Sequence, residues 1–181
     1  MTDTAKQKLI GLSRTMKWLC MAALIGVTMA ALFAGLSLVG DRGALLANIV
    51  GPTLRPDRIE GWQLGAILVV NGVGVLFLCA ALFALWEMFS EFAEGNILSP
   101  VPAQAMRKAG QHFLTAAVWS VIAHSVTVLL ATMNNPPGER SLAVALNSHQ
   151  LFPLLLAGVL FAVGHVLSEA TRLEEENRSF V

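Results

Sequence analysis

The sequence predicts an all-α integral membrane protein, an antiparallel four-helix bundle with both termini in the cytoplasm. Of its 181 residues, 55% are hydrophobic and 13% are charged, whereas soluble domains carry roughly a quarter charged residues. The charges are also segregated, because no Asp, Glu, Lys or Arg occurs within residues 18–40, 61–86, 109–138 or 141–168. Each run exceeds the ~20 residues that a helix needs to cross about 30 Å of hydrocarbon. We therefore expect a single membrane domain, residues 1–181.

The transmembrane helices are expected near residues 18–39, 63–86, 110–133 and 151–172. Such runs must be helical, because lipid offers no hydrogen-bond partners to the backbone. Trp18, Trp62 and Trp86 fall at span ends, where an indole keeps its N–H near water. Trp119 lies inside the third span. The first apolar run is too long for a cleaved signal peptide, so we expect it to remain as span one.

The orientation follows from the Lys and Arg residues that flank the spans. With the N-terminus inside, the cytoplasmic segments hold Lys6, Lys8, Arg14, Lys17, Arg107, Lys108, Arg172 and Arg178, eight of the twelve basic residues. The other four, Arg42, Arg55, Arg58 and Arg140, lie outside. The excess of basic residues on the inner side is modest, but the four basic residues before span one are expected to determine the orientation. Both termini and the loop between spans two and three are then cytoplasmic.

Small residues recur along span one at every fourth position, as Ala22, Gly26, Ala30 and Ala34. Spacings of the same kind are Gly61 with Gly65 and Gly158 with Ala162. Small side chains let two helix backbones approach closely in a membrane. We interpret these positions as contacts within one bundle rather than as a dimer interface, and a homo-oligomer stays open.

Three polar residues inside the spans are costly in lipid and therefore candidate functional residues: Asn71, His124 and His165. By depth, Asn71 and His124 could form a hydrogen bond that links two helices, while His165 lies nearer the inner leaflet. The two histidines differ by about 8 Å along the membrane normal, which disfavours a haem with two histidine ligands. We expect no cofactor and no metal.

The sequence gives little support to an enzymatic, redox or nucleic-acid-binding function. The chain lacks HExxH, GxSxG and phosphate-binding glycine motifs, so we do not expect an enzyme. Cys20 and Cys79 are both intramembrane and are expected to be free apolar fillers. The net charge of zero, without a basic patch interleaved with aromatic residues, disfavours direct nucleic-acid binding.

The cytoplasmic elbow, residues 88–109, largely coincides with the stretch FSEFAEGNILSPVPAQAMRKAG, residues 89–110. Gly95 and Asn96 tolerate a left-handed turn, and Ser99 followed by Pro100 predicts the start of a new helix. The first turns of that helix are expected to lie at the headgroup level, before Gly110 lets the chain turn into span three. The alternative is that the elbow serves as a connector alone.

The cytoplasmic tail, residues 173–181, should continue span four as a helix, because Glu169, Arg172 and Glu176 share one face. Residues 174–176 would then come within reach of Arg107 and Lys108. Phe180 and Val181 would fold back onto Phe89 or Phe92. The alternative is a solvated, charged helix end. The partner-binding surface predicted from elbow and tail comprises Phe92, Gly95, Ser99, Arg107, Lys108, Arg172, Glu175 and Glu176.

The elbow pattern Phe92, Gly95, Ile97, Ser99, Arg107 and Gly110, together with the ending SEATRLEEENRSFV, resembles the domain of unknown function family 2975. Leu98 stands where an aromatic residue is usual in that family. The resemblance covers most of the chain and implies a small bacterial four-helix protein of the cytoplasmic (inner) membrane. The family has no established reaction. Similar proteins are often encoded beside a small helix-turn-helix regulator, which implies a partner of that kind.

Two functions follow as hypotheses. The first is a regulatory or scaffolding membrane protein that binds a cytoplasmic partner through the elbow and the tail. The second is a small carrier or cofactor-binding membrane protein that uses Asn71, His124 and His165. The first is favoured, because the polar residues concentrate on one aqueous face while the spans are nearly apolar.

Overall fold

The computed structural model describes residues 3–40, 46–47, 50–51, 54–96, 99–136 and 148–179. This part of the chain is all-helical, as predicted, and four of its helices are long and apolar enough to cross a membrane. The elements are α1 (Asp3–Gly40), the short 3₁₀ helix η2 (Pro56–Arg58), α3 (Gly61–Glu94), α4 (Pro100–Thr132) and α5 (Ser148–Ser179).

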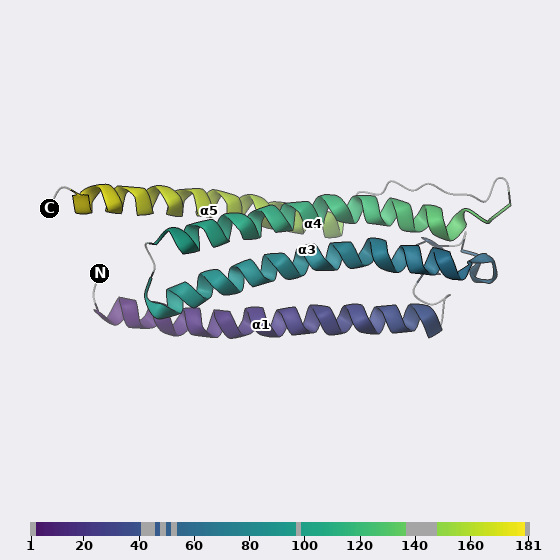
Figure 1. The fold of residues 1–181 in the computed structure, drawn as a ribbon, viewed down its shortest axis with the longest axis horizontal. Coiled ribbons are helices and arrows are strands. Elements are labelled where there is room, and N and C mark those ends of the chain that lie inside the picture. Colours follow the sequence, from purple (N-terminus) through teal and green to yellow (C-terminus); the bar gives the residue numbers. More distant parts are fainter. Residues whose placement is uncertain are drawn as a thin grey trace.

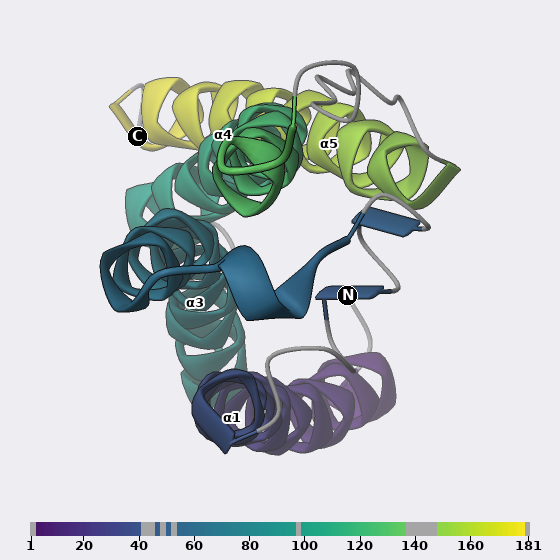
Figure 2. The ribbon, with the colours of Figure 1, turned by 90° about the vertical axis from the view of Figure 1, so that its right-hand side faces the viewer.

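The long helices pack in chain order. Among the described residues, α1 packs on α3, α3 on α4, and α4 on α5. Viewed from one end, they follow an open arc with α1 and α5 at its two extremities (Figure 2). The start of α1, the end of α3, the start of α4 and the end of α5 lie at the same end of the molecule (Figure 1). We call this the elbow end.

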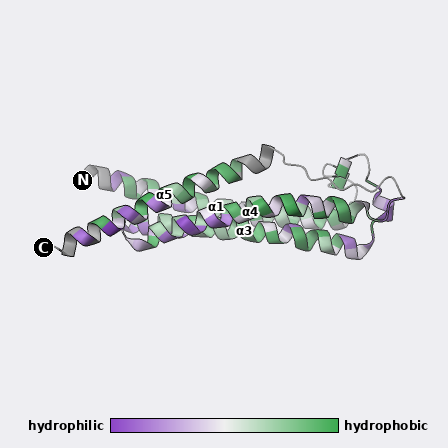
Figure 3. Ribbon diagram, turned by 90° about the horizontal axis from the view of Figure 1, so that it is seen from above, coloured by the Kyte–Doolittle hydropathy of each residue, from purple (hydrophilic) through white to green (hydrophobic). Residues whose placement is uncertain are grey.

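At the elbow end, the four long helices continue past the charge-free runs. The extensions are residues 3–17 of α1, 87–94 of α3, 100–108 of α4 and 169–179 of α5. At about 1.5 Å per residue they reach roughly 12 to 22 Å beyond the apolar part of each helix. The hydrophilic residues of α5 gather in its C-terminal half (Figure 3). The elbow end is therefore a bundle of helix ends that carries most of the charge of the described chain.

Buried apolar side chains of the described residues form two clusters along the helices. The first lies at the end opposite the elbow and joins α1, α3 and α4 through Leu38, Leu64, Ile67 and Ala131, with Leu46 and Ile59 between them. The second lies nearer the elbow and joins α3, α4 and α5 through Ala81, Ala84, Ala109, Phe113, Ala157 and Leu160. The many alanines let the helix axes approach one another closely.

α1 packs on α3 through a seam of less exposed positions that recur every three or four residues. The seam runs through Ile10, Ser13, Lys17, Cys20, Leu24, Val27, Ala31, Gly35 and Leu38. This alternation is typical of two helices that cross at a shallow angle.

The small-residue series of span one lies on a different face, which corrects the sequence prediction. Ala22, Gly26, Ala30 and Ala34 are all exposed, and a Cβ added at Gly26 would meet nothing within 4 Å. The pairs in α3 and α5 are exposed as well: Gly61, Gly65, Gly158 and Ala162. Small residues at this spacing allow another helix to approach closely. Which face of the helix is in contact depends on how the neighbouring helices pack.

α4 is a single helix through Gly110, so the predicted change of direction at that residue is wrong (Figure 1). Gly110 instead lies where α5 comes nearest. A Cβ at this position would be 3.2 Å from the carbonyl oxygen of Ala157 and 3.2 Å from the backbone nitrogen of Phe161. The glycine is therefore required by a helix crossing rather than by a turn.

Candidate functional site

The elbow turn is built as its residues predict. Gly95 has φ +89°, in the left-handed region that a glycine adopts without strain, and its N–H donates to the carbonyl of Phe92 at 3.1 Å. The N–H of Asn96 donates to the carbonyl of Glu91 at 3.0 Å, which completes the bonding of the helix end. Ser99 then has an extended backbone and Pro100 opens α4. The predicted helix start at Pro100 is confirmed.

Phe92 lies in the last turn of α3 and packs edge-to-face on Phe89, with ring centroids 6.4 Å apart. Both rings are partly exposed. The predicted contact of Phe180 and Val181 with these rings lies outside the described residues.

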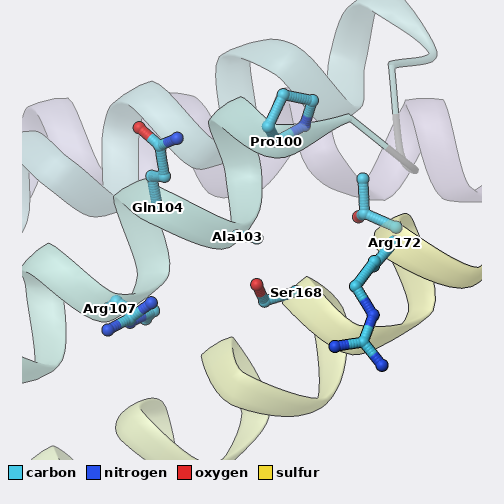
Figure 4. Close-up of a pocket in the computed structure, with 7 residues that line it drawn as sticks. Pro100, Ala103, Gln104, Arg107, Ser168 and Arg172 are labelled. Atoms are coloured by element: carbon cyan, nitrogen blue, oxygen red, sulfur yellow. The ribbon is translucent and has the colours of Figure 1, made fainter. Parts of the chain in front are cut away.

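A cleft of about 260 Å³ separates the start of α4 from the end of α5. Its polar lining comprises Gln104 and Arg107 from α4 and Ser168, Thr171 and Arg172 from α5. Ser168 lies between the two arginines in the view of Figure 4. The structure thus brings together two predicted site residues, Arg107 and Arg172, and adds three polar neighbours that sequence reasoning missed.

Glycine packing explains why α4 and α5 come together at this cleft. A Cβ on Gly164 would lie 3.0 Å from Cγ of Arg107 and 3.1 Å from its backbone nitrogen. With Gly110 opposite Ala157, the two glycines mark a close crossing. The backbone and Cγ of Arg107 therefore lie at the helix contact itself, and the residue is exposed and lines the cleft.

The charged partners differ between the two arginines. Arg172 contacts Glu169 at 3.0 Å and Glu176 at 3.5 Å along its own helix, which confirms the predicted shared face. For Arg107, the described residues include no partner in a salt bridge or a hydrogen bond. Lys108 is exposed and does not line the cleft. The side chain of Glu175 lies outside the described residues.

The intramembrane polar residues are not gathered into one site. Asn71 donates from Nδ2 to the hydroxyl of Thr127 at 3.0 Å and to the carbonyl of Ile67 at 2.8 Å. Its partner on α4 is therefore Thr127 rather than the expected His124, which lies one turn nearer the elbow end. His124 is half-buried, and His165 is exposed on α5. Asn71 thus links α3 to α4.

Two further contacts join α3 and α4, and both were missed from sequence. The fully buried Gln63 donates to the carbonyl of Leu130 at 2.6 Å. Trp119 donates from its indole nitrogen to the carbonyl of Val70 at 2.8 Å. This explains a tryptophan inside a span, since its N–H is satisfied by the neighbouring helix.

Gln63 also belongs to a polar cap at the end opposite the elbow. Its side-chain oxygen accepts from the N–H of Glu60 at 2.6 Å and from Asn134 at 3.2 Å. The spacing of Glu60 and Gln63 forms a capping box at the start of α3, a signal that the sequence carries. The cap binds the start of α3 to the end of α4.

Lys17 anchors α1 at the elbow end of the apolar region. Its Nζ donates to the hydroxyl of Ser90 at 2.8 Å and lies 5.2 Å from the ring centroid of Trp86. A Lys that pairs with an aromatic face at a span end is typical of the membrane interface. Trp62 and Trp86 on α3 are about 36 Å apart by helical rise, which matches the distance between the two interfaces of a bilayer.

The four membrane-length helices place the chain in the class of multi-pass helical membrane proteins. Comparisons of the chain with known protein families, with curated proteins and with solved structures found no match. The resemblance to the domain of unknown function family 2975 stays a prediction. Within the described part of the chain, no group of three or more His, Cys, Asp or Glu side chains is arranged to hold a metal ion.

Proposed function

We propose that this is a regulatory or scaffolding protein of the bacterial inner membrane that binds a cytoplasmic protein through its elbow end. In this proposal the four helices cross the bilayer in alternating directions, with both termini and the elbow in the cytoplasm. The observation that carries it is the extension of all four long helices past their charge-free runs at the elbow end. Such extensions give a membrane protein a folded surface in water.

The surface of the elbow end suits a protein partner. Its exposed residues outside the cleft between α4 and α5 carry both signs of charge and include an amide: Glu94, Asn96, Lys108 and Glu176. Mixed charges favour electrostatic complementarity with another protein over binding to a polyanion. The resemblance noted above implies a small helix-turn-helix regulator as this partner.

The carrier alternative receives less support. It would use Asn71, His124 and His165, and the hydrogen bond from Asn71 to Thr127 favours a structural role for Asn71. Interhelical hydrogen bonds of this kind contribute about 0.6 kcal/mol on average to the stability of membrane proteins.

The test is affinity purification in mild detergent followed by mass spectrometry. Four chains are compared: the wild type, a chain without residues 174–181, Lys108→Glu and a control variant. We expect the wild type to recover a cytoplasmic protein that the truncated chain and Lys108→Glu do not recover. A matched control is Arg58→Glu, because Arg58 is exposed in η2 at the opposite end. Equal recovery by all four chains would contradict the proposed function.

A further inference from the structure

The cleft between α4 and α5 combines cationic, hydroxyl and amide groups from two helices. Arg107 and Arg172 carry guanidinium groups, Ser168 a hydroxyl and Gln104 an amide. The hydroxyl of Thr171 already donates to the carbonyl of Leu167 at 2.9 Å, so it adds no donor. Guanidinium groups bind phosphate through paired N–H donors, and a hydroxyl such as that of Ser168 can add a single donor. This set of groups suits a phosphate ester rather than an apolar ligand.

The level of the cleft relative to the membrane limits which class of ligand it can meet. Arg107 precedes the charge-free run 109–138, and Arg172 follows the run 141–168. Both arginines therefore lie where hydrocarbon gives way to lipid headgroups. Lys17 and Trp86 form their interfacial contact at the corresponding ends of α1 and α3, which supports the same level.

The charge of the cleft is available to a ligand. Arg107 has no salt-bridge partner among the described residues. Arg172 contacts two carboxylates, but a guanidinium carries five N–H donors, so donors remain for a further anion. Both ion pairs of Arg172 are exposed, so each is weak and can be rearranged. Arg107 is therefore the main anion-binding group, and Arg172 is secondary.

The surroundings of the cleft favour a lipid over a soluble solute. Away from the elbow, both helices expose large apolar side chains, among them Leu114 and Val118 on α4 and Phe161 and Val163 on α5. A molecule with a phosphate in the cleft and acyl chains along these faces fits both regions.

We propose that the cleft between α4 and α5 is a binding site for an anionic phospholipid, with the lipid phosphate bound by Arg107. Basic pockets between transmembrane helices on the cytoplasmic side are known to bind anionic headgroups. The inference rests on the membrane placement given under the proposed function but does not require the protein partner. It assigns Arg107 to lipid rather than to the partner surface.

The experiment measures lipid binding to the full-length protein in mild detergent by native mass spectrometry. The probes are phosphatidylglycerol, phosphatidylcholine and inorganic phosphate, and the variants are Arg107→Gln, Lys108→Gln and Ser168→Ala. Lys108→Gln is the matched control, because it removes the same charge from the adjacent residue, which does not line the cleft. Melting temperature is measured for each variant to establish that it is folded.

We expect Arg107→Gln to weaken phosphatidylglycerol binding about tenfold, as for the loss of a charge-assisted hydrogen bond. Ser168→Ala should weaken binding about threefold through one neutral hydrogen bond, and Lys108→Gln should change it by less than about twofold. Should Arg107→Gln fail to fold, the loss caused by Ser168→Ala decides the question.

Several results would overturn the proposal. Equal losses for Arg107→Gln and Lys108→Gln would indicate diffuse electrostatic attraction without a site. Inorganic phosphate or phosphatidylcholine binding as tightly as phosphatidylglycerol would indicate a different ligand. If Arg107→Gln keeps its lipid but loses the recovered protein partner, the cleft belongs to that partner. If the truncated chain loses the protein partner but binds phosphatidylglycerol as the wild type does, the result bears on the proposed function and leaves the lipid site standing.

Discussion

Gly164 of α5 lies directly against Arg107 of α4. A Cβ at residue 164 would stand 3.0 Å from Cγ of Arg107, 3.1 Å from its backbone nitrogen and 3.5 Å from its Cα. Backbone atoms cannot move aside as the end of a flexible side chain can. The absence of a side chain on Gly164 therefore allows the crossing that brings Arg107 and Arg172 to one cleft.

Replacing Gly164 with alanine should lower the melting temperature of the detergent-solubilised protein. Overpacking of a close contact costs about 1–3 kcal/mol, because α4 and α5 must move apart. Gly158→Ala is the matched control on the same helix, since its added methyl group would meet nothing within 4 Å. Circular dichroism during heating measures both variants, and identical melting curves would contradict the close crossing.

Gly26→Leu should leave stability nearly unchanged, within about 0.5 kcal/mol, as for exposed positions in general. The reason is that Gly26 lies on the outer face of α1 with nothing near its Cβ position. Gly110→Ala is the comparison, because its methyl group would meet backbone atoms of α5 at 3.2 Å. A marked loss of stability for Gly26→Leu, or a change in oligomeric state on size-exclusion chromatography, would show that this face packs against another helix.

The hydrogen bond between Asn71 and Thr127 can be measured by a double-mutant cycle. Asn71→Leu and Thr127→Val, singly and together, should give a coupling free energy of about 0.6 to 1.7 kcal/mol in unfolding measurements. The parallel cycle of Asn71→Leu with His124→Leu should give a coupling near zero. A larger coupling for the histidine cycle would favour the pairing expected from sequence and contradict the contact described above.

The orientation can be tested by labelling single cysteines in intact cells with a maleimide that does not cross membranes. In a background with Cys20→Ala and Cys79→Ala, we expect Asn96→Cys and Ser179→Cys to stay unlabelled. Both positions lie at the elbow end, which the proposed orientation places in the cytoplasm. Asp57→Cys in η2 should be labelled, because it is exposed at the opposite end. Labelling at position 96 but not at position 57 would contradict the proposed orientation and indicate the opposite one.

Much of the helical architecture was predictable from charge and turn chemistry. The charge-free runs identified the four long helices of the described residues, and Ser99 with Pro100 predicted where α4 begins. Gly95 takes the left-handed backbone that its sequence context requires. These features depend on neighbouring residues alone, which is why a single sequence reveals them. The extension of α1 to Asp3 was not predicted, since its first turns carry no apolar pattern of membrane type.

The candidate site was predictable only in part. Arg107 and Arg172 were both proposed from sequence, but for different reasons: one as an elbow charge, the other as a member of a tail helix face. Their placement in one cleft with Ser168 and Thr171 depends on the crossing of α4 and α5. The partner of Asn71 was also misjudged, because depth along a helix does not specify which side chain of the neighbouring helix points toward it.

The sequence by itself determined that the chain forms membrane-length helices and where the turn at Gly95 falls, because hydrocarbon admits no unpaired backbone groups and glycine alone adopts that turn without strain. The tertiary structure decided which face of each helix is buried. In lipid, apolar side chains gain little by contacting each other rather than acyl chains, so a stripe of small residues does not identify its own neighbour. Shape complementarity made that choice: it left Gly26 exposed and placed Gly110 and Gly164 at the contact of α4 with α5.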